Sequence, residues 1–362
     1  MDSKYWIIVK TGEAEIRALE NVSLNILSHT LPLIEITRGR KVTKDNVETY
    51  PFDKRLSKIK GIFKGQTVAI DVTSEEALSS FETDRLYSPE NGYKNWIDFL
   101  LQLKEENIFK EIIPTVLFNF EDENFEENIG QQIQSLQDNF DSVLYRSNIG
   151  DDNCYEDIEL IHNKITDKAL HIVIDCGYIP QASYKNVAEK CIARINNIKQ
   201  IIEDSTCNYV VASTSFPNNV RDLGDVNTDT FSISEIEIFN TIIKEHNNVT
   251  YADYASINPI RNDTVTMARG WIPRIDVPLD KIVYYYKERR PKGVTAYAST
   301  YTQVARAVCS DDRFPYGLSE NWGIAQIKAC SQGASPSASP SFWISVRMNI
   351  HIEQQVKRIY SI

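Results

Sequence analysis

The sequence of 362 residues lacks several patterns that would define its class at once. Its formal net charge is −11, so it lacks the excess of lysine and arginine with which proteins neutralise nucleic-acid phosphates. Its six cysteines are scattered without a CxxC pair, which favours reduced thiols over a zinc site or a disulfide framework. No apolar run reaches transmembrane length, and the start "MDSKYW" is not a charged-then-apolar leader. We therefore expect a cytoplasmic protein that neither enters a membrane nor binds nucleic acid through bulk charge.

A GxGxxG turn is also absent after the first apolar segment, which counts against a dinucleotide-binding open sheet. What the sequence does have is a regular alternation of apolar and amphipathic segments. The apolar segments lack polar alternation, which is typical of strands buried on both faces. Strands are expected at 5–10, 31–36, 67–72, 112–119, 142–147, 170–175, 209–213 and 249–253. Helices are expected at 13–28, 95–106, 123–139, 155–164, 184–203 and 234–245.

Eight strands that mostly alternate with helices over about 250 residues are what a (β/α)8 barrel requires. A doubly wound open sheet shares the alternation and is the rival fold. We predict an α/β fold, with a (β/α)8 TIM-type barrel over residues 1–260 and a C-terminal α+β addition over residues 261–362. The addition is expected to close on the barrel mouth.

The sequence pattern of the C-terminal addition differs from that of the barrel. "GWIPRIDVPLDKIVYYYKERR" reads as a hairpin of two strands, and helices are expected across 296–309 and within "ENWGIAQIKAC". The last segment, "FWISVRMNIHIEQQ", alternates polar and apolar side chains, which predicts a closing strand. Its polar face would carry Arg347, Asn349 and His351, either over the barrel mouth or toward solvent.

In both candidate folds, functional side chains gather where parallel strands end on their carboxyl side, because variable loops lie there above a rigid sheet. We therefore expect a polar ring at the barrel mouth. The polar residues at these strand ends are Lys10, Glu35, Asp71, Asn119, Arg146, Asp175, Ser213, Thr214, Ser215 and Asp253.

The charged part of this ring has three interpretations. Glu35, Asp71 and Asp175 supply the hard oxygen ligands that magnesium or manganese prefers, which makes them candidate metal ligands. The same charges fit a salt-bridge network that completes the top layer of the barrel. Lys10 ends the first strand, where one class of barrel enzyme forms a pyridoxal-phosphate Schiff base, but no glycine-rich phosphate loop follows a late strand.

Several short motifs occur in a fixed order along nearly the whole chain. They are "YWIIVKTGEAEIRAL", "LPLIEI", "IVIDCG", "ASTSFP", "YADYASINP", "FPYGLSENWGIAQIKACSQG" and "WISVRMNIHIE". In this order they resemble the beta-protein family of bacteriophages and bacterial genomic islands. The resemblance implies a role in phage–host conflict beside a partner such as a nuclease of the same locus, and it implies no established activity. It marks as family positions Lys10, Glu35, Asp175, Ser215, Asp253, Trp322, Gly323, Asn349 and His351.

Three functions remain as alternatives. The first is a component of a phage–host conflict or antiphage defence system whose barrel mouth recognises a small or phosphorylated ligand or a partner protein. Its candidate ligand-binding residues are Arg146, Ser213, Ser215, Asp253, Trp322 and Asn349. The second is a metal-dependent, phosphodiesterase-like barrel hydrolase, whose candidate catalytic residues are Lys10, Glu35, Asp175 and His351. The third is a non-catalytic interaction module with Tyr284 and Tyr286 as aromatic contact residues.

Overall fold

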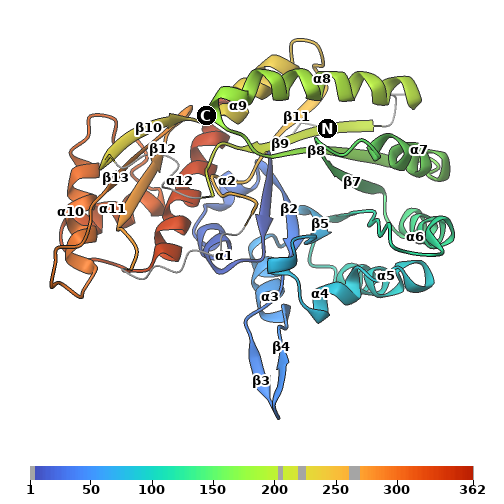
Figure 1. The fold of residues 1–362 in the computed structure, drawn as a ribbon, viewed down its shortest axis with the longest axis horizontal. Helices are drawn as coiled ribbons and strands as arrows, with labels where there is room; N and C mark the ends of the chain where they lie inside the picture. The colour runs from blue at the N-terminus through green and yellow to red at the C-terminus, as the bar shows by residue number, and fades with distance from the viewer. Residues whose placement is uncertain (1–4, 203–206, 219–225, 261–269, 362) are drawn as a thin grey trace.

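The main feature of the molecule is a sheet of eight parallel strands that curls into a nearly closed barrel (Figure 1). The computed structural model describes residues 5–202, 207–218, 226–260 and 270–361. The barrel strands are β1 (Tyr5–Lys10), β2 (Thr30–Ile36), β5 (Thr67–Val72), β6 (Glu111–Pro114), β7 (Ser142–Asn148), β8 (Ala169–Tyr178), β9 (Cys207–Thr214) and β11 (Val249–Asp253). All eight strands expected from the apolar segments are therefore confirmed.

The barrel strands follow one another around the sheet in chain order. β1 pairs with both β2 and β11, so the first and last strands of the barrel are neighbours. The ends of the sheet, β6 and β7, approach each other through a bridge between Thr115 and Leu144. A doubly wound sheet reverses its strand order at a switch point, whereas this order runs round once.

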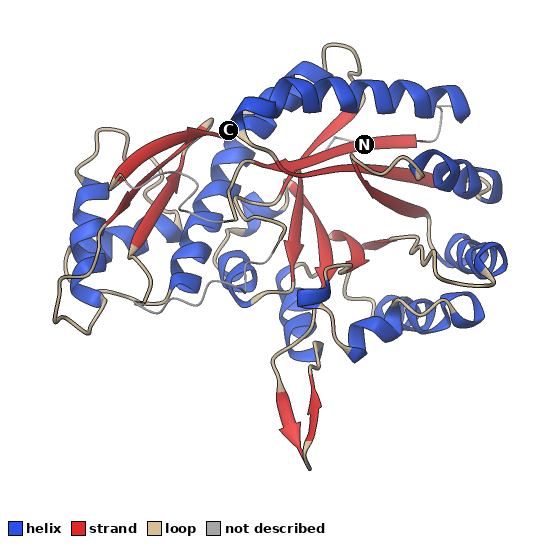
Figure 2. Cartoon of the chain, in the orientation of Figure 1, coloured by secondary structure: helices blue, strands red, loops and turns tan. Residues whose placement is uncertain are grey.

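Helices surround the barrel on its outer side (Figure 2). They are α1 (Glu13–Glu20), α2 (Leu24–Leu27), α3 (Asp53–Ile62), α4 (Phe81–Leu86), α5 (Glu90–Glu105), α6 (Phe125–Asn139), α7 (Cys154–Lys164), α8 (Tyr184–Ile201) and α9 (Ser234–Ile242). The helices α3 and α4 and the projecting hairpin of β3 (Val42–Lys44) and β4 (Val47–Thr49) were not expected from the sequence. No helix in the described ranges combines the length and apolarity that crossing a bilayer demands.

Side chains of the barrel strands alternate between the interior and the helix layer. Trp6, Ile8, Leu33, Val173 and Val210 belong to the inner cluster. The alternate residues of the same strands pack against the helices in a larger cluster. Because both faces are apolar, polar residues appear on the inner face chiefly at the strand ends, and this is where the candidate site lies.

The C-terminal part combines a three-stranded antiparallel sheet with three helices. The sheet is formed by β10 (Thr228–Ser232), β12 (Arg274–Pro278) and β13 (Ile282–Lys287), and the helices are α10 (Ala298–Cys309), α11 (Trp322–Ser331) and α12 (Pro340–Tyr360). The expected hairpin is confirmed as β12 and β13, with β10 as an additional strand. The boundary expected between residues 260 and 261 lies at the edge of the undescribed segment 261–269, so the division into two domains stays a prediction.

The segment expected as a closing strand is the helix α12, so that prediction is wrong. The Ser339 hydroxyl caps the helix by accepting a hydrogen bond from the Phe342 N–H at 3.2 Å, and Pro340 stands in the first turn, where its missing N–H costs little. Figure 1 places α12 between α1 and the three-stranded sheet, and it packs on both. A helix buried around most of its circumference need not show a polar stripe with helical spacing. The alternation of polar and apolar residues in this segment therefore gave a wrong prediction of a strand.

Candidate functional site

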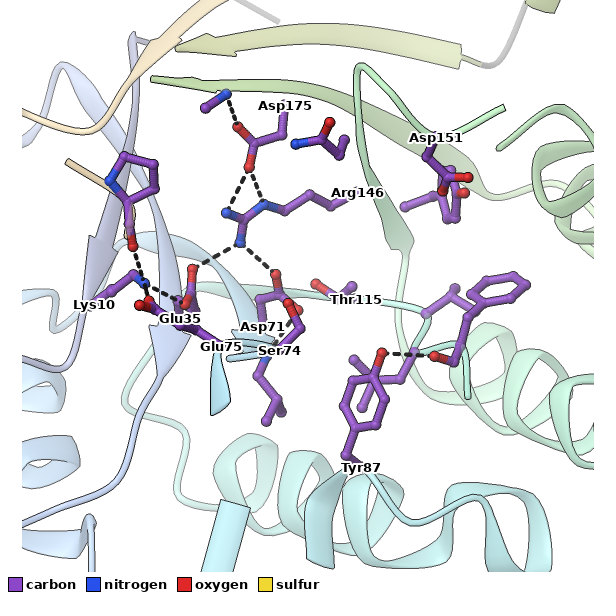
Figure 3. A pocket seen from close by; sticks show the side chains of 18 of the residues that line it. Lys10, Glu35, Asp71, Ser74, Glu75, Tyr87, Thr115, Arg146, Asp151 and Asp175 are labelled. Atoms are coloured by element: carbon purple, nitrogen blue, oxygen red, sulfur yellow. Dashed lines mark hydrogen bonds and ion pairs between the residues drawn. The ribbon is translucent and has the colours of Figure 1, made fainter. Parts of the chain in front are cut away.

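Five charged side chains converge at the carboxyl ends of the barrel strands (Figure 3). Strand register explains part of this convergence, because Lys10 stands beside Glu35 and Glu35 beside Asp71 on successive parallel strands. Neighbours in register project to the same face of a sheet. The structure thus brings together, from the expected ring, Lys10, Glu35, Asp71, Arg146 and Asp175.

Arg146 is the centre of this cluster. Its Nη1 lies 3.0 Å from Oε2 of Glu35 and 2.9 Å from Oδ2 of Asp71. Its Nη2 lies 2.8 Å from Oδ2 of Asp175, which also accepts a hydrogen bond of 2.5 Å from the Tyr254 hydroxyl. One guanidinium therefore compensates three carboxylates that would otherwise repel one another in a buried place.

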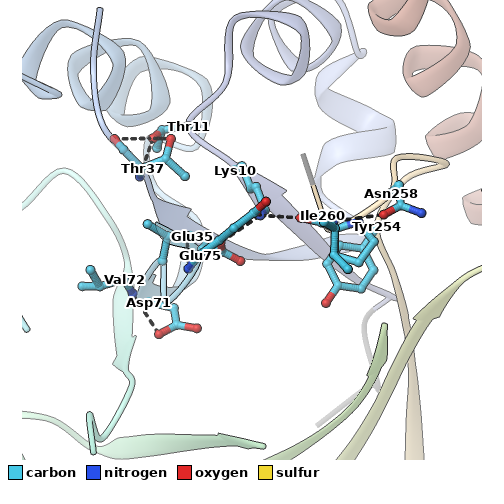
Figure 4. A network of polar contacts seen from close by, with 12 residues as sticks. Lys10, Thr11, Glu35, Thr37, Asp71, Val72, Glu75, Tyr254, Asn258 and Ile260 are labelled. Atoms are coloured by element: carbon cyan, nitrogen blue, oxygen red, sulfur yellow. Dashed lines mark hydrogen bonds and ion pairs between the residues drawn. The ribbon is translucent and has the colours of Figure 1, made fainter. Parts of the chain in front are cut away.

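Lys10 forms a second group beside the first (Figure 4). Its Nζ lies 3.2 Å from Oε1 of Glu35 and 2.7 Å from Oε2 of Glu75, and it donates to the carbonyl oxygen of Pro259 at 2.6 Å. Lys10 thus donates two hydrogen bonds, to Glu75 and Pro259, and forms ion pairs with both Glu35 and Glu75. Glu35 bridges the two groups, and a Schiff base at Lys10 would require these contacts to break.

Burial and neighbouring charges act in opposite directions on the carboxylates. Burial raises the pKa of Glu35, but the charges of Arg146 and Lys10 outweigh it, so this pKa lies below its ordinary value. Burial also raises the pKa of Asp71; Arg146 offsets only part of this and Glu35 adds to it, so the pKa stays above its ordinary value. Adjacent carboxylates with diverging pKa values are used in acid–base catalysis, and structural ion networks produce them as well.

A cavity of about 610 Å³ opens above this charged floor. Its walls include Tyr87, Phe118, Asp151 and Asp157, which come from the segments that follow the barrel strands. Its rim carries Phe120 and Ile260, whose side chains are each 60% exposed. The cavity therefore combines a fixed polar floor with an apolar entrance.

The expected metal ligands Glu35, Asp71 and Asp175 all contact the Arg146 guanidinium. In the part of the chain that the structure describes, no group of three or more His, Cys, Asp or Glu side chains is arranged to hold a metal ion. A magnesium or manganese ion between these three carboxylates stays a prediction, and it would require Arg146 to move away.

Asp253 and His351 lie outside the cavity, which corrects their expected place at the mouth. Asp253 faces the helix layer, where its Oδ2 lies 2.8 Å from Nε2 of His351 and accepts a hydrogen bond of 2.9 Å from the Tyr251 hydroxyl. Its other oxygen accepts from the Tyr5 hydroxyl at 2.5 Å. This buried group fastens α12 to the outer wall of the barrel.

The remaining expected residues also lie outside the cavity. Ser213 has the strand parity of Tyr209 and Val211, which face the helices, and the Ser215 hydroxyl donates to the Glu235 carboxylate. Asn349 accepts a hydrogen bond of 3.0 Å from the Gly323 N–H. The ring of the neighbouring Trp322 packs on Phe342, with the ring centroids 5.7 Å apart. The cavity is lined by no residue of the described range 270–361, so the expectation that the C-terminal part closes on the mouth is wrong there.

The aromatic contact surface expected at Tyr284 and Tyr286 is also corrected. Tyr284 is completely buried, with the Arg313 guanidinium 4.5 Å from its ring centre, and Tyr286 is half-buried. Both rings pack in the core of the C-terminal part. Tyr284 is therefore unavailable as an aromatic anchor for a partner, whereas Tyr286 keeps part of its surface exposed.

Sequence reasoning missed several residues of the cavity. Tyr254 directly follows Asp253, and a shift of one residue decides which of the two points into the barrel. Glu75 lies in the loop after β5, and Asp151 and Asp157 lie before and in the first turn of α7. Their position after barrel strands indicated a functional role, because such loops carry functional residues. Loops have no residue periodicity, however, so the sequence does not show which of their residues face the cavity.

These features define an α/β protein whose eight-stranded parallel barrel holds a buried ion network beneath an open cavity. The chain belongs to the Beta protein family, whose sequence model matches residues 5–357. Protein beta of Enterobacteria phage P4 is 30% identical over 366 residues, which cover 98% of this chain and 93% of that protein. The family resemblance carried by the ordered motifs is therefore confirmed, and one relative is encoded by a phage.

One solved structure with detectable similarity is that of the spore cortex-lytic enzyme SleL of Bacillus megaterium QM B1551. It is 12% identical with a TM-score of 0.34, and the match covers 96% of this chain and 74% of that one. Similarity at this level carries no argument about fold or activity.

Proposed function

We propose that the protein is a recognition component in phage–host conflict, and that the cavity at the barrel mouth binds its ligand. The observation that carries this proposal is the pairing of a largely buried, hydrogen-bonded ion network with exposed apolar side chains above it. Ligand sites in proteins are concave and largely preformed, with apolar surface and a few fixed polar groups. The phage P4 relative, which matches along nearly the whole chain, supports the link to phage biology.

We also propose that the barrel is of the TIM type and that the remaining residues form an addition to it. Residues 1–260 form a (β/α)8 barrel of the TIM type, with residues 261–362 as a C-terminal addition whose sheet is joined by the strand β10 from the barrel region. The single circuit of eight parallel strands supports this description. Sites in barrels of this class lie at the carboxyl ends of the strands, where the cavity is found.

The ligand is a small molecule or a segment of a partner protein, and antiphage chemistry is performed by a partner such as a nuclease of the same locus. A metal-dependent hydrolase is the weaker alternative, because the Arg146 guanidinium stands where the three expected ligands meet. A ligand-binding role requires no rearrangement of this network.

The test removes the apolar rim and leaves the ion network intact. Phe120→Ala combined with Ile260→Ala truncates two side chains that are each 60% exposed. The free energy of unfolding should change by less than about 1 kcal/mol, because each side chain loses little buried surface. Phe81→Ala is the matched control, since Phe81 is 75% exposed and does not line the cavity.

Thermal-shift measurements would use nucleotides, sugars, amines and short peptides as probes. At least one class should raise the Tm of the wild type and of Phe81→Ala, and should leave the double variant unshifted. The double variant should also lose any effect of the wild type on phage plating. If no probe shifts the wild type and the double variant keeps its full effect on plating, the cavity is not the recognition site.

A further inference from the structure

The cavity at the barrel mouth is strongly acidic. Its basic side chains are Lys10 and Arg146, and its carboxylates are Glu35, Asp71, Glu75, Asp151, Asp157 and Asp175. Two cations against six carboxylates give the lining a formal charge of −4. Charge of one sign in a cleft with low-dielectric walls concentrates ligands of the opposite sign.

Both basic side chains are already used within the protein. The Arg146 guanidinium contacts three carboxylates and the Tyr254 hydroxyl. The Lys10 ammonium contacts two carboxylates and a backbone carbonyl. An anionic ligand such as a phosphate would have to displace these buried partners and would also face the excess of carboxylates.

Two carboxylates on the β7 and α7 side of the cavity lack a counterion. Within the described ranges, neither Asp151 nor Asp157 forms an ion pair with a lysine, arginine or histidine. Asp157 is only 5% exposed, and its Oδ2 accepts a hydrogen bond of 2.6 Å from the Tyr145 hydroxyl. Figure 3 shows Asp151 apart from the Arg146 network and without a contact to it. A buried carboxylate that faces a cavity without a cation is an incomplete ion pair.

Aromatic rings lie beside these two carboxylates in the cavity wall. Phe118 lies in the cavity wall, with its ring centre 5.5 Å from that of Tyr145 and 6.0 Å from that of Phe120. The electron-rich faces of such rings attract an organic cation, and their apolar surface covers its alkyl part. Carboxylates with aromatic rings around them are a lining suited to an amine or guanidinium on an alkyl chain.

We propose that the group admitted by the cavity is such an organic cation, an alkylamine or alkylguanidinium, and that Asp151 and Asp157 bind its charge while Phe118 and Phe120 cover its chain. This inference rests on the proposed function, because it names the chemistry of the ligand at the same site. The cation belongs either to a free small molecule or to a lysine or arginine side chain of a partner protein. Both sources present the same group to the cavity.

Isothermal titration calorimetry with four probes distinguishes these possibilities. Agmatine represents the free molecule, and the blocked tripeptide Gly-Arg-Gly represents the protein side chain. Gly-citrulline-Gly has nearly the same shape without the charge, and inorganic phosphate represents an anion. The variants are Asp151→Asn with Asp157→Asn, and Asp152→Asn as the matched control, since Asp152 is exposed and does not line the cavity.

Agmatine or Gly-Arg-Gly should bind the wild type and Asp152→Asn with the same Kd, and the double variant at least tenfold more weakly. The citrulline peptide should bind the wild type at least tenfold more weakly than the arginine peptide. Binding of agmatine alone identifies a free amine, and binding of the peptide alone identifies a partner's side chain. Asp151→Asn by itself, at a half-buried position, serves if the double variant does not fold.

Tighter binding of phosphate than of either cation overturns the inference, and so does cation binding that the double variant leaves unchanged. In both cases the proposed function survives where the rim variant abolishes the binding, because the ligand then lies in the cavity, and it fails where the rim variant leaves the binding unchanged. If none of the four probes binds while the rim variant described above abolishes the response to another probe class, only the cation inference fails. If the rim variant also has no effect, both proposals fail together.

Discussion

The Nε2 atom of His351 lies 2.8 Å from Oδ2 of Asp253, although the two residues are 98 positions apart. Both side chains are completely buried, and the tyrosines Tyr5 and Tyr251 donate to the same carboxylate. The contact joins the last strand of the barrel to the middle of α12. A buried hydrogen-bonded pair of this kind holds two structural units in one relative position, because removing either partner leaves a polar group of the other buried without its hydrogen bond.

Replacing His351 by Phe should therefore destabilise the protein strongly. The loss in free energy of unfolding at pH 7 should be about 1.5–3 kcal/mol, since the buried Asp253 carboxylate loses its hydrogen bond to the imidazole. Lys357→Gln is the matched control on the same helix, because its pair with Glu353 is half-exposed and its removal should cost less than about 1 kcal/mol. Urea unfolding of both variants checks the difference, and equal losses would contradict this account.

The same pair predicts a pH dependence. Burial raises the pKa of Asp253, but the charge and hydrogen bond of His351 outweigh it, so the folded-state pKa lies below its ordinary value. Asp253 thus contributes stability that is present above its unfolded pKa of about 3.9 and is lost as the pH falls below it. The stability difference between wild type and His351→Phe should shrink below about pH 4. A constant difference down to pH 3 would show that the lost contribution is packing alone.

Replacing Arg146 by Met should remove the common counterion of Glu35, Asp71 and Asp175. We expect a loss of about 3–5 kcal/mol at pH 7, because buried carboxylates lose their partner. In the variant, Arg146 no longer offsets the burial of Asp71, and Glu35 keeps only Lys10 as a cation, so the folded-state pKa values of these two carboxylates rise. The folded variant then binds more protons than its unfolded form, so its stability rises as the pH falls.

Arg194→Met is the control for this variant. Arg194 is more deeply buried than Arg146, and its guanidinium donates to the backbone carbonyls of Asn148, Ile149 and Asp151. Its replacement should cost stability without a comparable dependence on pH. Urea unfolding of both variants between pH 4 and pH 7 separates the two cases, and parallel curves would refute the role assigned to Arg146.

The eight strands and the charged floor were predictable because their signals are local. A strand buried on both faces is uniformly apolar, and its last inner residue is charged where it meets the mouth, as at Lys10, Glu35 and Asp71. Whether the last residue of a strand points into the barrel or toward the helices cannot be read from the local sequence. Asp253 and Tyr254 are successive residues, and the one that faces inward depends on the pairing of β11 with β1 and β9.

The helix α12 could not be predicted, because its buried polar residues depend on contacts with distant parts of the chain. Its residues Arg347, Asn349 and His351 are all buried, because the barrel, β12 and α11 cover different sides of the helix. Their partners, which include Asp276, Gly323 and Asp253, are distant in sequence. Only Ser339 and Pro340 carried a local signal of a helix start, and the alternation that follows them concealed it.

The Trp-Gly motif of the family has a steric explanation that can be tested at Gly323. A Cβ atom at this position would lie 2.6 Å from the carbonyl oxygen of Val346 and 2.7 Å from Cγ1 of Ile350. Gly323→Ala should therefore push α11 away from α12 and cost about 1–3 kcal/mol. Gly61→Ala is the control, because Gly61 lies in the helix α3 with nothing within 4 Å of an added Cβ. It should gain up to about 1 kcal/mol from helix propensity, and the same sign for both variants would contradict the explanation.

Asp157 should prove to be a residue that costs stability. Burial raises its pKa to about 6, and the nearby charge of Asp151 adds to the effect. Between about pH 4 and that value the folded state holds a proton that the unfolded state has lost, so the stability of the wild type falls as the pH rises through this range. Asp157→Asn removes the charge and keeps an oxygen that accepts from the Tyr145 hydroxyl. Relative to the wild type it should therefore gain stability from pH 4 to pH 7, whereas Asp152→Asn should show no such trend. A variant that loses stability at pH 7 would mean that the carboxylate is structural, and a variant that gains it would mean that the carboxylate serves binding at the expense of folding.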